Sequence, residues 1–225
     1  MTNIPILEVR DLTVVYNENT PYEVVALRNF SFKVQKGEIV LITGGNGTGK
    51  STLLAAISGT MPIKSGQILI NGIDVTKLGA IKRAKYLGTV HQDTMLGTCP
   101  NLTIQENFQL ANTKSWWLPI PYSLKLTKTQ IERIKNIGLL LETRGKSKIN
   151  MLSGGQRQAI AVCLAFENNK PILLFDEFTS ALDEKTKLNV LNFTIENARN
   201  SSSTILMVLH NANNYSFHFN SIINL

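Results

Sequence analysis

The sequence predicts an α/β fold whose core is a mainly parallel sheet. Three observations support this prediction: a glycine-rich loop joins a short apolar strand to a helical segment, strands then alternate with helical patterns, and 43% of the 225 residues are hydrophobic against 17% charged. Such alternation is typical of a parallel sheet covered by helices on both faces. A chain of this length can bury a substantial core, so we do not expect intrinsic disorder.

The individual elements are predicted from hydrophobic periodicity. Residues 6–16 and 24–34 are β-rich and partly alternating, which indicates half-exposed strands, whereas 38–43 (EIVLIT) is nearly continuous and apolar, which indicates a buried strand. Residues 50–59 have helical spacing and close on Gly59, a residue suited to a C-terminal cap. Further strands are expected at 67–71, 86–91, 171–175 and 203–209, and further helices at 127–142, 154–168 and 183–198.

Residues 93–150 contain no convincing core strand, and we predict helices joined by loops there, with Pro119 and Pro121 interrupting the middle. We therefore predict one domain over 1–225, in which 1–92 and 151–225 form the core and 93–150 a helical subdomain.

The net charge of +7 is concentrated in residues 114–148, which carry eight Lys or Arg and two Asp or Glu. Nucleic acid, an anionic lipid surface, an acidic partner or a solvated helical face would each suit this segment, and charge alone does not choose among them.

Location and redox state are indicated by what the sequence lacks. No apolar run approaches the roughly 18 residues that cross a bilayer. The first residues, MTNIPILEVRDL, lack the basic region and apolar stretch of a signal peptide, so we expect a cytosolic location. Cys99 and Cys163 have no metal-ligand spacing, so we expect two reduced thiols and no zinc site.

The strongest motif is a phosphate-binding loop. Residues Gly44-Gly45-Asn46-Gly47-Thr48-Gly49-Lys50-Ser51 match G-x-x-x-x-G-K-[ST] between the buried strand and the helix. The glycines let the backbone fold around an anion with its N–H groups pointing inward, and the helix adds its positive N-terminal end. The sequence therefore predicts a nucleotide site in which Lys50 contacts the β- and γ-phosphates and Ser51 ligates Mg²⁺.

A second motif, Asp176-Glu177, ends the apolar run 172–175. The carboxyl end of a parallel strand lies at the sheet edge where ligands bind, beside the phosphate loop if the two strands are neighbours. We predict that Asp176 holds Mg²⁺ and its waters, and that Glu177 accepts a proton from the water that attacks the γ-phosphate. Taken alone, this motif could equally be an acidic helix N-terminus.

The stretch Leu152-Ser153-Gly154-Gly155-Gln156-Arg157-Gln158 resembles the signature motif of the ATP-binding subunits of ABC transporters. Other family motifs follow in order: Gln92 in VHQD resembles the Q-loop, Ser180-Ala181-Leu182-Asp183 the D-loop, and His210 the switch histidine. Tyr16 lies where the family places an aromatic residue that stacks on adenine. The resemblance extends over essentially the whole chain.

The resemblance implies a P-loop NTPase fold with a mainly parallel core sheet, an N-terminal antiparallel β subdomain and a helical insertion. It also implies an ATPase in which two subunits enclose two ATP molecules, each between the phosphate loop of one subunit and the signature motif of the other. The implied nucleotide-binding residues are Tyr16, Gly44, Gly45, Asn46, Gly47, Thr48, Gly49, Lys50, Ser51, Thr52, Ser153, Gly154, Gly155, Gln156 and Asp183. The expected Mg²⁺ ligands are Ser51, Gln92 and Asp176, and the expected catalytic residues are Glu177, His210 and Gln92.

Family members dock their helical insertion onto membrane subunits. The resemblance therefore implies transmembrane permease subunits, a second ATPase subunit and a substrate-binding protein as partners, on the inner face of the cell membrane. We expect the second ATPase subunit to be identical, with a different ATPase chain as the alternative. The basic segment 114–148 would face the anionic cytoplasmic leaflet, with Trp116-Trp117 either lining the docking groove or packed inside the insertion. We expect no nucleic-acid partner, since the long coiled-coil insertion or second fused ATPase domain of soluble ABC ATPases does not appear.

A narrower resemblance concerns a bacterial subgroup linked to binding-protein-dependent uptake of tryptophan and tyrosine. It is carried by ITGGNGTGKSTLLAAISG, NGIDVTKLGAIKRAKYLGTVHQD and MLGTCPNLTIQENFQLA, and by Asn220 in place of a common Asp. His91 and Thr94 depart from the Phe and Pro expected around Gln92, and the final hairpin usual in the family does not follow Leu225; both departures bear on coupling or stability. We expect an importer of an amino acid or similar small solute, with an export or lipoprotein-release ATPase, or a soluble ABC ATPase without a transport role, as the alternatives.

Overall fold

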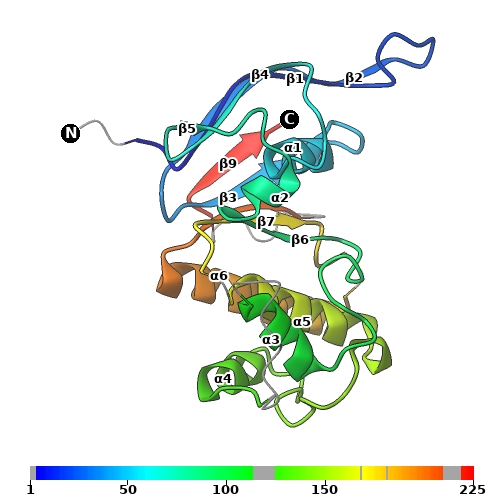
Figure 1. Ribbon diagram of the computed structural model, residues 1–225, viewed down its shortest axis with the longest axis vertical. Helices are drawn as coiled ribbons and strands as arrows, with labels where there is room; N and C mark the ends of the chain where they lie inside the picture. Colours follow the sequence, from blue (N-terminus) through cyan, green and yellow to red (C-terminus); the bar gives the residue numbers. More distant parts are fainter. Residues whose placement is uncertain (1–3, 114–124, 168, 181, 210–218) are drawn as a thin grey trace. The chain divides into compact units, whose positions relative to one another are not determined.

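The computed structural model describes residues 4–113, 125–167, 169–180, 182–209 and 219–225 (Figure 1). The chain divides into two compact units: the first comprises Met1–Thr89, Lys170–Asp176 and Ala198–Leu225, and the second Val90–Asn169 and Glu177–Asn197. The second unit contains the whole of the predicted helical subdomain, and it also takes in 151–169 and 177–197. Within the described ranges, no helix has both the length and the apolar character that crossing a membrane requires.

A five-stranded sheet, most of it in the first unit, forms the core. Its order is β6 (Leu87–Val90), β7 (Ile172–Asp176), β8 (Thr204–Val208), β3 (Ile39–Thr43) and β9 (Ser221–Asn224). The β7–β8, β8–β3 and β3–β9 pairings are all parallel. Nearly every residue of β3, β7 and β8 is buried, which explains why these strands are continuous apolar runs in the sequence.

A second, antiparallel sheet belongs wholly to the first unit. Its order is β2 (Val24–Val34), β1 (Leu7–Tyr16), β4 (Ser65–Ile70) and β5 (Ile73–Asp74). β1 pairs antiparallel with both β2 and β4, and the register of its pairing with β2 shifts between Val9 and Leu12. The predicted α/β fold with a mainly parallel sheet and an antiparallel β subdomain is thus confirmed.

Helix α1 (Lys50–Ser58) packs against β7 of the core sheet and β2 of the antiparallel sheet, between the two (Figure 1). Its buried side chains, among them Leu53 and Ile57, join one apolar cluster with residues of both sheets. The helix begins after Gly49 and ends at Gly59, whose φ of 80° confirms the predicted cap.

A buried arginine completes the C-terminal end of α1. Arg83, the last residue of the short helix α2 (Ala80–Arg83), is only 2% exposed. Its Nη1 donates to the carbonyls of Ala56 and Ile57 at 2.7 and 2.8 Å, while Nε and Nη2 donate to the carbonyls of Leu78 and Thr76 at 2.7 and 2.8 Å. A guanidinium therefore satisfies carbonyls that the last turn of a helix leaves without intrahelical partners.

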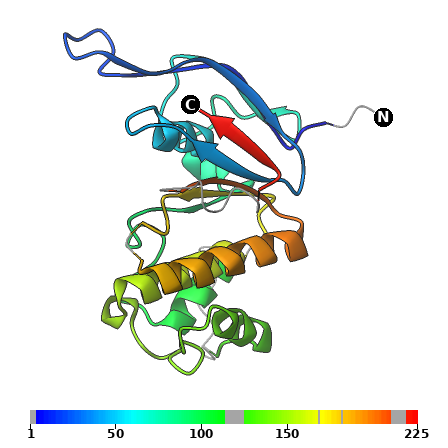
Figure 2. The ribbon, with the colours of Figure 1, turned by 180° about the vertical axis from the view of Figure 1, so that it is seen from behind.

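The second unit is helical. It contains α3 (Ile104–Asn112), α4 (Lys128–Asn136), a short 3₁₀ helix (Ile149–Met151), α5 (Gly154–Ala165) and most of α6 (Glu184–Ser201). Both α3 and α4 pack against α5 (Figure 2). The ring of Phe166 meets that of Phe193 of α6 edge-on, with 6.2 Å between the ring centroids. Both cysteines are free thiols, as expected, and Cys163 is buried in α5.

Several elements differ from the predictions. The helix expected over 127–142 ends at Asn136, because Gly138 adopts φ 76° and Leu140 φ 54°, conformations that no α-helix contains. We did not predict β5, α2, α3 or the edge strand β9 as separate elements. The remaining predicted strands and helices agree with the structure to within three residues at either end.

Candidate functional site

The phosphate loop connects β3 to α1 in the first unit. Gly44, Gly47 and Gly49 have φ values of 147°, 78° and 96°, which favour glycine. A Cβ added at Gly49 would lie 2.7 Å from the carbonyl oxygen of Ala26, and one at Gly44 would lie 2.7 Å from that of Leu225. The loop therefore requires glycine at these two positions, on both conformational and steric grounds.

The N-terminus of α1 is suited to an anion. Its N-cap, Gly49, supplies no side-chain hydrogen bond, and the first turn contains no acidic residue. The N–H groups of this turn, with the positive end of the helix dipole, are thus free of local acceptors. Lys50 lies beside them, and its Nζ donates to the carbonyls of Gly44 and Gly45 at 3.0 and 2.7 Å, which holds the loop against the helix.

The Ser51 hydroxyl and the Asp176 carboxylate lie side by side. Ser51 Oγ donates to Asp176 Oδ1 at 2.9 Å. The strands that carry the two motifs are not neighbours, since β8 lies between β3 and β7, and the hydrogen bond joins the first turn of α1 to the end of β7. No cluster of three or more His, Cys, Asp or Glu occurs among the described residues. A hydroxyl and one carboxylate fit Mg²⁺, which commonly completes its coordination with substrate phosphates and water.

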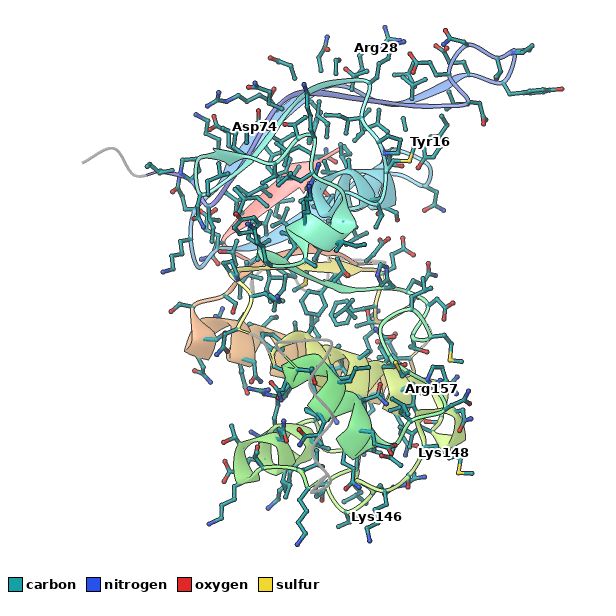
Figure 3. All side chains as sticks on the ribbon, viewed as in Figure 1. Tyr16, Arg28, Asp74, Lys146, Lys148 and Arg157 are labelled. Atoms are coloured by element: carbon teal, nitrogen blue, oxygen red, sulfur yellow. The ribbon has the colours of Figure 1, made fainter. Side chains whose placement is uncertain are left out.

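Tyr16, the last residue of β1, lies beside the same loop. Its hydroxyl is 2.9 Å from Thr52 Oγ1, and Thr52 is buried in the first turn of α1. Tyr16 as a whole is 39% exposed, so its ring can take part in stacking while the hydroxyl is anchored. Figure 3 shows this side chain near the end of β1.

The signature segment begins α5 in the second unit. Ser153 is the N-cap: its Oγ accepts from Gln156 N at 3.3 Å, and Gln156 Oε1 accepts from Ser153 N at 3.1 Å. This capping box leaves the hydroxyl hydrogen of Ser153 available to donate to another acceptor. The first turn again contains no acidic residue, and Gly154 is exposed.

The D-loop packs beside the signature segment within the second unit. A Cβ added at Gly155 would lie 3.3 Å from Leu182 Cδ2 and 3.4 Å from Thr186 Cγ2. The Asp183 carboxylate accepts from Thr186 N at 3.0 Å, and its hydrogen bonds to Thr186 lower the pKa of Asp183. Asp183 thereby caps α6 and stays ionised.

Glu177 follows β7 with a φ of 41°, in the left-handed region that a glutamate rarely adopts. Such a conformation costs on the order of 1 kcal/mol and is typical of functional sites. The turn that follows is closed by Ser180 N, which donates to Glu177 O at 3.0 Å.

The Q-loop residue Gln92 is exposed in the second unit. The carbonyl of its neighbour His91 accepts from Gln158 Nε2 at 3.4 Å, which connects this loop to α5. His210, Ala181, Trp116 and Trp117 lie outside the described residues, and their predicted roles stay predictions.

One residue near the signature segment was not found by sequence reasoning. Arg144 Nη1 donates to Gln156 Oε1 at 3.3 Å. A single cation in a basic loop gives no sequence signal of such a contact, so only the structure identifies it.

Residues 27–180 match the family model described as ABC transporter. The chain belongs to the ABC transporter family. A tyrosine transport ATP-binding protein of Clostridioides difficile (strain R20291) is 40% identical over 184 residues, which cover 81% of this chain and 73% of that protein. The spermidine/putrescine import ATP-binding protein PotA of Mannheimia succiniciproducens is 35% identical over 212 residues, 92% of this ABC chain, which spans 51%, about half, of PotA.

A dimeric ATP-binding cassette, solved in a post-hydrolysis state bound to ADP and Pi, superimposes on this ABC subunit with a TM-score of 0.79. The two chains are 27% identical, and the match covers 97% of this chain and 94% of the other. Together these similarities confirm the predicted family, its P-loop NTPase fold and its assignment as an ATPase.

Proposed function

We propose that this ABC ATPase energises the import of an amino acid or similar small solute through ATP-driven closure of a dimer. The observation that carries the proposal is the uncapped, acid-free N-terminus of α1 with Lys50 beside it and the Ser51–Asp176 pair 2.9 Å apart. Such a site suits a triphosphate together with one hard cation.

In this proposal the first unit binds the nucleotide. Tyr16 stacks on the adenine, the N–H groups of 44–52 bind the phosphates, and Lys50 contacts the β- and γ-phosphates. Ser51, Asp176 and Gln92 would hold Mg²⁺, which when bound neutralises charge on the phosphates.

A second, identical subunit completes each site. The Ser153 hydroxyl and the amides of Gly154 and Gly155 would bind the terminal phosphate of the nucleotide on the neighbouring chain, and Asp183 would act across the interface. The acid-free N-terminus of α5 favours an anion there, and the dimeric relative supports this arrangement.

Hydrolysis is assigned to the residues that surround the attacking water. Glu177 would accept its proton, and the strained backbone at this position is typical of functional sites. His210 would contact the γ-phosphate, and Gln92 would orient the water and report the nucleotide state to the membrane partner.

We place the subunit on the inner face of the cell membrane, bound to permease subunits and served by a substrate-binding protein. Exposed Lys125, Lys128, Lys146 and Lys148 in the basic segment favour an orientation of this segment toward anionic lipid. The tyrosine transport relative supports an aromatic amino acid as the solute.

Three substitutions test the mechanism. Lys50→Ala should abolish productive ATP binding, and Ser153→Arg should block the ATP-dependent dimer while one chain still binds nucleotide. Glu177→Gln should slow hydrolysis by about 10² to 10⁴ and leave binding intact, the usual contribution of a positioned base. Turnover of Glu177→Gln at the wild-type rate would remove the base assignment.

The direction of transport is tested with permease subunits in proteoliposomes. For import, ATP hydrolysis should rise when a binding protein loaded with tyrosine or tryptophan is added on the outside. Stimulation by a lipoprotein or an internal solute instead would support the exporter alternative.

A further inference from the structure

Arg144 lies on a segment fixed to the start of α3. The residues 144–149 run beside the N-terminus of that helix, where Gln105 N donates to Gly145 O and Ile104 N donates to Ser147 O, both at 3.0 Å. Arg144 itself begins a turn, since Ser147 N donates to its carbonyl at 2.8 Å. The backbone that carries the guanidinium is therefore held in place on both sides.

From this position the side chain reaches the signature segment. One oxygen, Gln156 Oε1, accepts from both Arg144 Nη1 at 3.3 Å and Ser153 N at 3.1 Å. The amide group of Gln156 thus has one orientation in which it serves the capping box and the guanidinium together. Removing Arg144 frees this carboxamide to rotate, and with it the Ser153 cap.

The electrostatic setting shows that helix stability alone does not account for this cation. A positive charge beside a helix N-terminus is unfavourable, because that end of the dipole is itself positive. Arg157 in the first turns of α5 and Lys148 on the 144–149 segment add further positive charge (Figure 3). An arrangement of this kind becomes favourable when an anion occupies the helix end.

We propose that Arg144 is a positioning residue for ATP-dependent dimerisation. It holds Gln156, and through it Ser153, in one geometry. In that geometry the serine hydroxyl and the Gly154 and Gly155 amides receive the terminal phosphate of the nucleotide on the other subunit. The positive charge of Arg144 also attracts this phosphate. This inference rests on the proposed two-subunit site.

The test compares Arg144→Met, Arg144→Lys and the matched control Lys146→Met, whose side chain is exposed and makes no hydrogen bond or ion pair within the described ranges. Dimer formation with a non-hydrolysable ATP analogue and Mg²⁺ is measured by analytical ultracentrifugation at several salt concentrations. Binding of the analogue to the single chain is measured at protein concentrations below dimerisation, and thermal stability is recorded for each variant.

We expect Arg144→Met to weaken each of the two sites about tenfold, and hence the symmetrical dimer about a hundredfold, because the terminal phosphate loses a nearby cation and the signature segment is no longer held ready to receive it. Single-chain affinity should stay at the wild-type value, Lys146→Met should dimerise normally, and Arg144→Lys should recover part of the loss. The deficit should shrink as salt rises, which a purely structural role would not produce.

Ser153→Arg separates this inference from the proposed function. If that variant dimerises normally, the two-subunit site is wrong and the role of Arg144 falls with it. If Ser153→Arg blocks dimerisation while Arg144→Met does not, only the inference about Arg144 is overturned. Equal losses in Arg144→Lys and Arg144→Met with no salt dependence, or weakened analogue binding by the single chain, would also overturn it.

Discussion

Replacing Arg83 by Met tests how the first unit holds the helix behind its phosphate loop. The substitution keeps a long apolar side chain but removes the guanidinium that donates to the carbonyls of Ala56, Ile57, Leu78 and Thr76. Each buried carbonyl that loses its partner costs about 1 to 3 kcal/mol. Because Arg83 is only 2% exposed, water cannot readily replace it. The carbonyl of Ala56 keeps a second donor, Gly59 N at 3.3 Å, so three carbonyls lose their partner, and at the lower end of that range the loss is about 3 kcal/mol.

The free energy of unfolding is measured by urea titration followed by circular dichroism. The neighbouring Lys82→Met, on the exposed side of α2, serves as control and should lie within about 0.5 kcal/mol of wild type. Arg83→Lys should recover only part of the loss, because one ammonium cannot reproduce the planar fork of donors. A change in Arg83→Met below about 1 kcal/mol would show that the carbonyls find other partners, and would refute the argument.

Three further predictions concern other contacts. Hydrogen bonds from Arg10 and Lys33 lower the pKa of Glu8 to about 2. The contribution of Glu8 to stability is therefore complete above its ordinary pKa of 4.5 and is lost as the pH falls from there toward 2. In urea titrations, the free energy of unfolding of Glu8→Gln should change less with pH over that window than that of wild type, and an equal change in both proteins would contradict this. Glu167 accepts from Asn112 and Gln130 and pairs with Arg133, so Glu167→Ala should cost about 3 kcal/mol in urea unfolding, whereas the exposed Glu196→Ala should cost almost nothing. Tyr16→Phe should raise the Kd for ATP about two- to fivefold through loss of the contact with Thr52, and Tyr16→Ala about tenfold or more through loss of stacking; equal Kd values for the two variants would exclude a stacking role.

Local pattern was enough to predict the elements that carry the phosphate loop. The strand before it and the helix after it have strong periodicity and glycine boundaries, and both agree with the structure within one residue. The edge strand β9 escaped prediction because it has only four residues and forms through a distant partner, with Val40 opposite Ser221. Asn220 just before it pairs with Ile39 through its side chain and its backbone, a contact that sequence spacing cannot reveal.

The helix expected over 127–142 shows a different kind of error. The apolar residues Ile137 and Leu139–Leu141 continue the helical pattern past the point where Gly138 ends it. Glycine in an otherwise periodic run is a known stop signal, so this boundary could have been found.

The candidate site was predictable to the extent that its motifs are contiguous. Residues 44–52 and 152–158 could be identified from the chain alone because backbone groups of neighbouring residues do the binding. The contacts made by Arg83, Arg144 and Thr52 could not, because each depends on side chains brought together from separate elements.

The contact of Gly155 with Leu182 and Thr186 has a mechanical consequence. Because Gly155 has no side chain, the first turn of α5 packs directly against the turn that leads into α6, and a shift of one would displace the other. A displacement of Asp183 by a contact with a second subunit would therefore also displace the Ser153 hydroxyl. A methyl group added at position 155 would increase the distance between the two segments and weaken this coupling.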